Sequence, residues 1–443
     1  MNVDVKPMKT AAELALASIF AAAKGKLPGS GPVAALRDNA FLDFEARGLP
    51  HRRVEEWKYT DLRALMRDAK PLAAPPDAAD KARVKAAPCP VGDVECRRIV
   101  FVNGVFVPEL SDLAALENGL TIIPMAEALA KGDPRVTAQL GNINTSNDVT
   151  IALNTALMRD GVFIHVAPGA AVEKPLHLVF VAPDSAASVF TRSLMVLEKG
   201  ARAMLIESHE GPGTDYQVNA ALEMVVGDEA HVDHVKLIVE GPKALHVSTL
   251  LATIGARARF NNFSFITGGA VVRNQIFLRF DGADTVAGIR GASLLGGKQH
   301  ADTTLVVDHK STGCQSRELF KSVLDGESHN IFQGKIIVQP GAQKTDARMM
   351  TQALLLSDPA EADSKPELEI FADDVQCGHG STAGALDQNL LFYLKARGIP
   401  QKEAEALLIQ SFVGEAIEGI EHAGLREVLI EAVVARLASR ELK

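Results

Sequence analysis

Hydrophobic and polar positions divide the chain into three zones. Residues 1 to about 70 place Ala and Leu at helical spacing among Arg and Glu, which predicts amphipathic helices. The stretch at 71–93 contains five prolines and many alanines, a composition typical of a linker. From about 98 the pattern changes to short β-rich runs, and helical spacing returns from about 385. The chain therefore combines a central β region with helices on both sides.

The β-rich runs follow one another with almost no helix-length pattern between them. A doubly wound parallel sheet needs a helix between successive strands, so the pattern disfavours that class. The runs include IVFVNGVFV (99–107), VFIHVA (162–167), LHLVFVA (176–182), SLMVLE (193–198), HVDHVKLIVEG (231–241), TTLVVDH (303–309) and GKIIVQP (334–340).

Glycine–alanine corners recur through the central zone at a nearly fixed period. Such a period, with strands in each repeat, predicts a solenoid of stacked coils, and a parallel β-helix fits best. Glycine suits these corners because it tolerates positive φ. A β-sandwich is the rival architecture, but Asn-Gly and Asp-Gly hairpin turns are sparse. The corners begin at Gly169, Gly200, Gly227, Gly255 and Gly282, with intervals of 31, 27, 28 and 27 residues.

These patterns predict a mainly β protein in three parts. Residues 1–97 form an N-terminal helical domain and linker, residues 98–384 the β-helix core, and residues 385–443 a C-terminal helical domain. Helices are predicted within 389–398, 401–420 and 425–439, where breakers fall between them. We expect these last helices to close the end of the solenoid, which would otherwise expose an unpaired strand edge.

Charge and composition exclude several classes of protein. The net charge of -9 gives no basis for nucleic-acid binding, and no apolar run approaches the ~20 residues of a membrane helix. LALASIFAAA (14–23) has the length of an export-signal core, but Asp4 and Glu13 favour an ordinary helix. Cysteines occur only at 89, 96, 314 and 377, too few for a disulfide framework, so a reducing compartment such as the cytoplasm is expected.

Cys377 and His379, in DDVQCGHGSTAGALD (373–387), are the strongest candidates for metal or redox chemistry. Zinc sites and iron–sulfur clusters usually take four protein ligands, yet no two cysteines have the spacing of a chelating loop. If this pair binds a metal, the missing ligands come from another chain or from the bound species. The alternative is an inert, buried cysteine beside a turn histidine.

Other motifs are weaker. GASLLGGKQ (291–299) lacks a phosphate-loop glycine and its Ser/Thr, so it is interpreted as a solenoid corner. His231 and His234 lie three apart, hence on opposite faces of a strand, and with His246 are expected to be solvated or hydrogen-bonded rather than joint metal ligands. HRRVEEWKYTDLRAL (51–65) holds the only tryptophan, Trp57, as a helix anchor or a partner surface.

Three blocks together resemble the SufB/SufD family of iron–sulfur cluster assembly proteins. The resemblance spans nearly the whole chain and implies a right-handed parallel β-helix flanked by helical domains, in a non-catalytic scaffold. EEWKYTDL favours the SufD branch, and the additional cysteines of SufB chains are absent. The blocks are EEWKYTDL (55–62), DHKSTGCQSRELFKSVLDGESHNIFQGKIIV (308–338) and KPELEIFADDVQCGHGSTAGALDQNLLFYLKARGI (365–399).

The resemblance also implies partners. A SufD-type chain pairs with SufB, the nascent cluster forms at their interface, and His379 with Cys377 beside it would be this chain's metal-binding contribution. No cluster is held by the chain alone, and reduced flavin is associated with the family complex. The isolated chain could form a homodimer through the same surface. The ATPase SufC would dock on the C-terminal helices, for which the candidate residues are Phe392, Tyr393, Leu407 and Phe412.

Two alternative functions remain open at this point. One is a β-helix enzyme acting on polysaccharide. Such enzymes are commonly secreted, so the lack of a convincing export signal argues against this function. The other is a purely architectural partner of SufC, for which the Cys377–His379 pair would have no role in cluster assembly.

Overall fold

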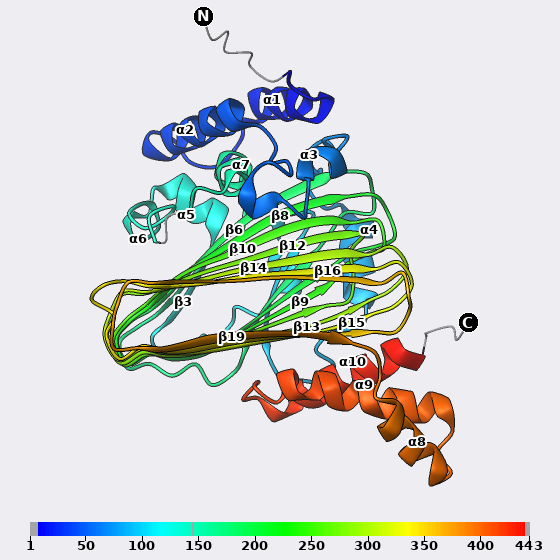
Figure 1. Cartoon of the computed structure of the whole chain (residues 1–443). Coiled ribbons are helices and arrows are strands. Elements are labelled where there is room, and N and C mark those ends of the chain that lie inside the picture. Colours follow the sequence, from blue (N-terminus) through cyan, green and yellow to red (C-terminus); the bar gives the residue numbers. More distant parts are fainter. Residues whose placement is uncertain (1–7, 144–145, 439–443) are drawn as a thin grey trace, which may run out of the picture.

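Two large sheets form a parallel β-solenoid at the centre of the molecule (Figure 1). The structure is a computed structural model and describes residues 8–143 and 146–438. The chain passes alternately through the two sheets for about eight turns, and neighbouring strands run parallel except for one antiparallel pair at the first end of each sheet. The predicted solenoid is confirmed, and the rival β-sandwich is wrong because neighbouring strands are joined by full turns rather than hairpins.

The ten-stranded sheet contains β1 (Arg97–Val102), β2 (Val105–Phe106), β5 (Leu176–Val181), β7 (Arg202–Glu210), β9 (His231–Val239), β11 (Arg259–Ile266), β13 (Val286–Leu295), β15 (Gln315–Leu324), β17 (Asp346–Leu355) and β19 (Gln376–Gly384). The nine-stranded sheet contains β3 (Leu120–Pro124), β4 (Val162–Val166), β6 (Ser188–Leu197), β8 (Gln217–Val226), β10 (Leu245–Ile254), β12 (Val271–Phe280), β14 (His300–His309), β16 (His329–Val338) and β18 (Glu361–Ile370).

The helices are α1 (Ala11–Ala23), α2 (Pro32–Arg47), α3 (Leu62–Leu65), α4 (Ala78–Ala86), α5 (Met125–Lys131), α6 (Pro134–Thr137), α7 (Val149–Leu157), α8 (Gln388–Ala396), α9 (Gln401–Ile417) and α10 (Ala423–Ala438), with 3-10 turns η1 (Glu55–Trp57) and η2 (Pro108–Leu110). None of these helices is both long and apolar enough to cross a membrane.

Identical positions of successive turns stack inside the solenoid. Leu222, Leu250, Ile276 and Leu305 occupy one ladder across four strands of the nine-stranded sheet, and each is at most 1% exposed. Side chains alternate between the two faces of a strand, so every second residue enters this lumen. A single coil could not bury these residues, which is why the repeats stack.

The glycine corners have two different causes. Gly169 and Gly200 adopt φ of +69°, as the sequence predicted. The later corners differ, because the positive φ falls on a neighbouring residue such as Arg257, at φ 54°. Gly255 is needed there for close approach: a Cβ on it would lie 2.7 Å from the backbone nitrogen of Asp228 in the preceding turn. The positive-φ explanation is therefore wrong at Gly255.

Trp57 anchors the N-terminal helices to the nine-stranded sheet. The ring is 1% exposed, its Nε1 donates to the Asp148 carboxylate at 2.8 Å, and the Arg273 guanidinium lies 4.4 Å from its centroid. Burial of the ring with a partner for its N–H favours the anchoring interpretation of residues 51–65. Helices α2 and α7 pack together above β6 and β8 (Figure 1).

Two stretches are more helical than the sequence indicated. The presumed linker at 71–93 contains α4, which begins with a reciprocal capping box between Asp77 and Asp80 and buries Val84. Helices α5 to α7 lie inside the range expected to be β-helix, before the first parallel strand of the nine-stranded sheet. Seven of the nine residues of α7 are buried, and Thr150, Asn154 and Thr155 are among them, so burial is not confined to one apolar stripe.

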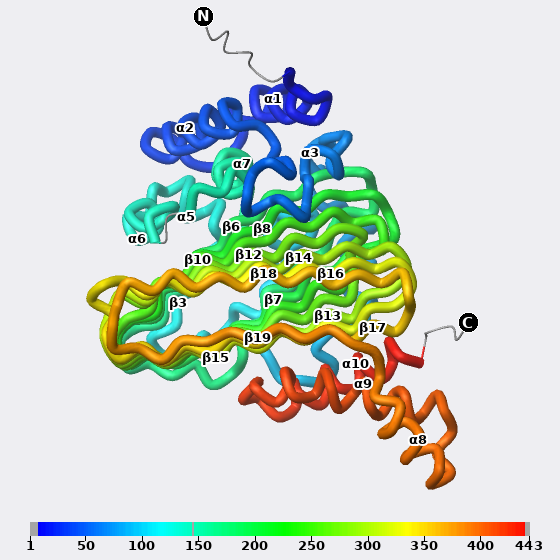
Figure 2. Tube along the Cα trace, viewed as in Figure 1, coloured from blue at the N-terminus to red at the C-terminus, as the bar shows by residue number. Residues whose placement is uncertain are grey.

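The C-terminal helices do not close the solenoid. Helix α9 packs along the outer face of β13 and β15, with Ile409 and Val413 in its apolar contact. Figure 2 shows the last turn, β18 and β19, at the near end of the solenoid with no helix in front of it. The expectation of a helical cap is wrong because the apolar stripe of α9 faces the side of a sheet.

Candidate functional site: the last strand of the solenoid

Cys377 and His379 lie on β19, the outermost strand of the ten-stranded sheet. Register with β17 pairs Cys377 with Ala347 and His379 with Met349, and both partners are buried lumen residues. Because stacked positions share a face, the two side chains occupy the lumen face at its open end. Cys377 is half-buried and His379 is exposed.

The coordination sphere at this position is incomplete. Among the described residues, the groups of three or more His, Cys, Asp or Glu side chains close enough to share a metal include neither Cys377 nor His379. Cys314 is buried directly before β15, and its thiol donates to the Gly282 carbonyl at 3.3 Å. Cys89 and Cys96 pack against the apolar cluster that includes residues of α9 and α10. All four cysteines are free thiols.

The surroundings of Cys377 favour its protonated form. Burial raises the pKa of the Cys377 thiol above its ordinary value, and the nearby Asp346 and Glu318 carboxylates add to that effect. A thiol is a poor metal ligand and nucleophile until it loses its proton. Cys377 therefore needs a neighbouring cation, such as a metal ion, to become a thiolate at neutral pH.

A titratable group that the sequence did not reveal lies behind the pair. Glu318 occupies the same ladder as Met349 and His379, two strands further into the lumen, and is 2% exposed. Neither carboxylate oxygen has a well-formed hydrogen bond in the described part of the chain, and burial raises the pKa of Glu318 to about 7. Only the register brings Glu318 near His379, so no local motif could have identified it.

The two edge strands of the last turn differ in charge. Strand β19 contains no Asp, Glu, Lys or Arg, whereas β18 carries five such side chains and a proline. Charged residues and proline on an edge strand oppose pairing with another chain. The edge of β19 is therefore the one suited to accept a further strand. The residues of this kind on β18 are Glu361, Asp363, Lys365, Pro366, Glu367 and Glu369.

The candidate SufC-contact residues separate into two groups. Phe392 is 73% exposed and Tyr393 53% exposed on α8, and Leu407 on α9 is 43% exposed. Phe412 instead packs against the solenoid, where the Lys321 ammonium lies 4.4 Å from the centre of its ring. An exposed apolar face on α8 and α9 is thus present, but Phe412 is turned away from it.

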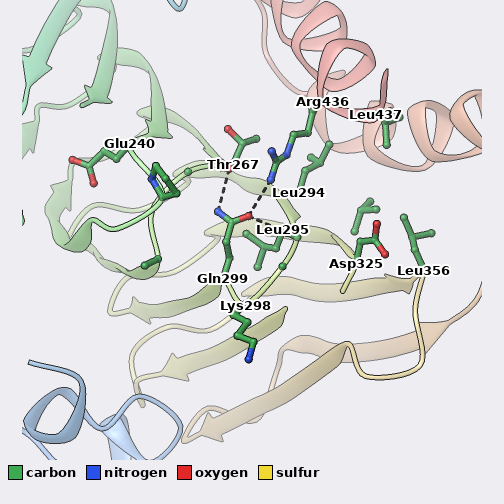
Figure 3. A pocket seen from close by; sticks show the side chains of 16 residues that line it. Glu240, Thr267, Leu294, Leu295, Lys298, Gln299, Asp325, Leu356, Arg436 and Leu437 are labelled. Carbon is green, nitrogen blue, oxygen red and sulfur yellow. Dashed lines mark hydrogen bonds between the residues drawn. The ribbon is translucent and has the colours of Figure 1, made fainter. Parts of the chain in front are cut away.

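A wide hollow lies elsewhere, between α10 and the corners that follow β13 and β15 (Figure 3). Its floor is apolar, with Leu294 and Leu295 among its residues. Arg436 of α10 donates to the Gln299 side chain at 3.0 Å, and Gln299 donates to the Gly269 carbonyl at 3.0 Å. Residues 291–299 thus form the end of β13 and a solenoid corner, as predicted, and the hollow is remote from His379 in the register.

Comparison with known proteins identifies the class to which this fold and open-ended site belong. Residues 180–412 match the family model described as the SufBD core domain of the SUF system of iron–sulfur cluster assembly, and residues 15–178 match the SufBD N-terminal region. The core match alone covers more than half of the chain. The chain belongs to the SufBD family of iron–sulfur cluster assembly proteins.

Individual relatives place it near SufD. The iron–sulfur cluster assembly protein SufD of Escherichia coli is 30% identical over 88% of this chain and 90% of its own length. An iron–sulfur cluster assembly SufBD family protein of Synechocystis is 30% identical over 88% of this chain and 87% of its own length. A SufBD family protein of Mycobacterium tuberculosis is 28% identical over 91% of this chain. The resemblance noted in three sequence blocks is confirmed over the whole fold.

Proposed function

We propose that the chain is a non-catalytic scaffold subunit that pairs with a SufB-type partner through β19 and shares a nascent iron–sulfur cluster with it. The observation that carries the proposal is the position of Cys377 and His379 on an outermost strand that has no charged residue or proline to oppose pairing. Side chains directly opposite each other on paired strands lie about 5 Å apart. Ligands from a partner strand would therefore meet His379 within reach of a single iron atom or small cluster.

The chemistry of the pair suits this cargo. A neutral imidazole is a good ligand for ferrous iron, and a thiolate binds iron or sulfane sulfur. Cys377 would become a ligand only when a positive ion arrives, because its surroundings favour the thiol in the chain alone. Four unpaired cysteines suit a reducing compartment, and we place the protein in the cytoplasm.

The second partner is a SufC-type ATPase. Phe392 and Tyr393 on α8 and Leu407 on α9 present apolar side chains to solvent, which supports protein docking at this surface. Helix α8 follows β19 by only a few residues, so movement of a protein docked there would act directly on the last turn. ATP-driven movement of SufC would then open or shear the interface with the SufB-type partner.

The test is His379→Ala in the reconstituted complex with SufB and SufC. We expect the complex to keep its composition, because an exposed edge histidine contributes little to folding. The yield of cluster in anaerobic reconstitution, followed by visible absorption and by iron and sulfide analysis, should fall at least about tenfold.

Ser381→Ala is the matched control, since Ser381 lies two residues further along the same face of β19. It should leave the cluster yield unchanged. A normal yield from an intact His379→Ala complex would refute the shared-cluster proposal and favour a purely architectural subunit.

A further inference from the structure

Two buried histidines and a buried glutamate meet at the edge of the lumen in the early turns of the solenoid. His209 lies on β7, Glu240 directly follows β9, and His246 lies on β10; they are 1%, 5% and 0% exposed. One ligand atom from each lies within 4.8 Å of the other two. Glu240 and His246 lie six residues apart around one corner, and the coiling of the chain brings His209, about one turn earlier in the sequence, beside them.

The polar atoms of this cluster lack the partners that burial normally demands. Neither ring nitrogen of His209 or His246, nor one oxygen of Glu240, has a hydrogen bond among the described residues. His246 Nδ1 lies 3.0 Å from Glu240 Oε2, but without the angles of a hydrogen bond. A buried polar group without a partner is costly, so three of them together indicate a missing ligand.

We propose that His209, Glu240 and His246 bind a divalent transition metal ion of the zinc and ferrous class. Two imidazoles and one carboxylate form a donor set typical of these ions, whereas calcium and magnesium prefer oxygen ligands alone. The ligand atoms are already close to the spacing that a metal with bonds of about 2.1 Å requires. The inference does not rest on the proposed role of His379.

The surroundings prepare His209 for this role. Burial, with a smaller contribution from the neighbouring His246, lowers the pKa of His209 well below its ordinary value, so the ring is in the neutral form that binds metals. The Phe180 ring stacks on it at 4.9 Å between centroids, which fixes its plane. The Glu207 carboxylate also lies close by, 3.9 Å from His209 Nε2.

A route for the ion is also present. Glu240 borders the wide hollow between α10 and the solenoid, where Figure 3 labels it at the margin. The same residue and His209 line a small cavity on the lumen side. Glu240 therefore lies between the outer hollow and the small cavity beside the cluster, which is where an ion would approach the site.

The structure provides a matched control group. His231, Asp233 and Glu421 also place ligand atoms within 4.8 Å of one another, but at the surface and already in ion-pair contact. A metal that binds the chain only loosely would be expected at this exposed group. Variants at the two groups therefore separate a built site from surface adsorption.

The experiment titrates the chelator-treated full-length chain with Co²⁺ and records the visible absorption of the bound ion. We expect saturation near one equivalent, a rise in the thermal midpoint with Zn²⁺, and at least a tenfold loss of affinity in each of His209→Gln, Glu240→Gln and His246→Gln. His231→Gln should keep the wild-type affinity and spectrum.

Circular dichroism of the metal-free variants shows whether each is folded, and Glu240→Gln, the least bulky change, is expected to fold normally. Two results would overturn the inference. The first is folded wild-type protein that shows neither a Co²⁺ spectrum nor stabilisation by Zn²⁺. In that case the cluster is a buried contact between His246 and Glu240 and not a metal site. Binding lost in His231→Gln but kept in a folded Glu240→Gln or His246→Gln would assign the metal to the surface.

Discussion

The two ends of the solenoid are built differently. At the first end, short antiparallel strands finish both sheets: β2 pairs with β1, and β3 pairs with β4. At the last end, β18 and β19 are full-length parallel strands with no strand beyond them in the described chain. Every residue of β1 but one is buried, whereas β18 and β19 contain no buried residue. One end is finished within the chain, and the other is suited to continuation by a second chain.

The lumen holds polar as well as apolar side chains. In the first turns apolar residues such as Ile99, Phe101 and Leu178 fill it, but His209 lies on the same ladder as Phe101. Near the last turns the lumen also holds Glu318 and His309, and burial lowers the pKa of His309 to about 4. Apolar stacking alone would have been more stable, so the polar groups of the lumen, in its early and its late turns, are a feature that stability does not explain.

The largest effect is expected where the first end is held together. The Asp160 carboxylate accepts hydrogen bonds of 2.9 Å from the backbone N–H groups of Phe106, Ala126 and Gly161, and so ties β2 and the start of α5 to β4. Asp160→Ala would leave three donors without their partner. At roughly 1–3 kcal/mol per buried donor, we expect a loss of about 4 kcal/mol in the free energy of unfolding, measured by urea titration.

Asp374→Ala is the counterpart at the last end. Asp374 is exposed and forms a surface ion pair with Lys344, so its removal should change the free energy of unfolding by less than about 0.5 kcal/mol. Equal losses at the two positions would show that the ends do not differ in how far the chain itself stabilises them.

The next effect depends on pH and belongs to Glu318. An unfolded carboxyl of this type titrates near 4.3, while the folded pKa is about 7. Between these values the unfolded chain releases a proton that the folded chain keeps, so stability falls as pH rises from about 4 to about 7 and stays low above it. Glu318→Gln should therefore gain up to about 3 kcal/mol at pH 8 and little near pH 4.

The groups around Glu318 do not reverse this sign. Arg317 and the Ser316 hydroxyl favour the ionised carboxylate, but burial outweighs both. The nearby His309 lies 3.1 Å from the Ser316 hydroxyl, and burial lowers its pKa to about 4, so it is neutral over the upper part of this range, where Glu318 titrates. Urea midpoints at several pH values measure the effect, with the exposed Glu327→Gln as the control. A Glu318→Gln variant whose stability parallels the wild type at every pH would mean that Glu318 titrates normally.

The architecture could be predicted from the sequence because the repeat is local. Corner glycines and short β runs recur every turn, and the register confirms it: His231 pairs with Arg259 and Arg259 with Val286, steps of 28 and 27 residues. The Cys377–His379 pair could also be recognised in the sequence, because both residues lie within one strand, two positions apart. The failure at α7 has a physical cause, because a helix of nine residues is too short for its pattern to stand out among the neighbouring β-rich runs.

Groups assembled across turns could not be predicted. Glu318 meets the ladder of His379 only through β17, and His209 and His246 come from two strands and Glu240 from the corner between β9 and β10. Their chemistry depends on which face of each strand enters the lumen, and an error of one residue in register would move them to the outer surface. The prediction that α8 to α10 close the end of the solenoid was also wrong. An apolar stripe shows that a helix face is buried but does not show which surface of the solenoid it packs against.

Ser381→Pro should have only a small effect on folding, and it tests most directly whether the open end accepts a further strand. The Gln376 N–H donates inward to the Thr345 carbonyl, so by the alternation of a parallel strand the N–H of Ser381 points outward from β19. Proline at an edge is tolerated when its missing N–H faces outward. We therefore expect a change of at most about 1 kcal/mol in the free energy of unfolding.

Association should respond much more strongly. Proline removes one ladder hydrogen bond and adds the bulk of its ring. We expect the dissociation constant for a SufB-type partner, and for any homodimer of the isolated chain, to rise at least tenfold, or ~1.4 kcal/mol. Analytical ultracentrifugation measures both, with Ser381→Ala as the control that keeps the N–H. Thr382→Pro, whose N–H faces β17, should instead destabilise the monomer. If Ser381→Pro pairs as tightly as the wild type, the partner does not extend the sheet at β19, and the open end must be covered in some other way.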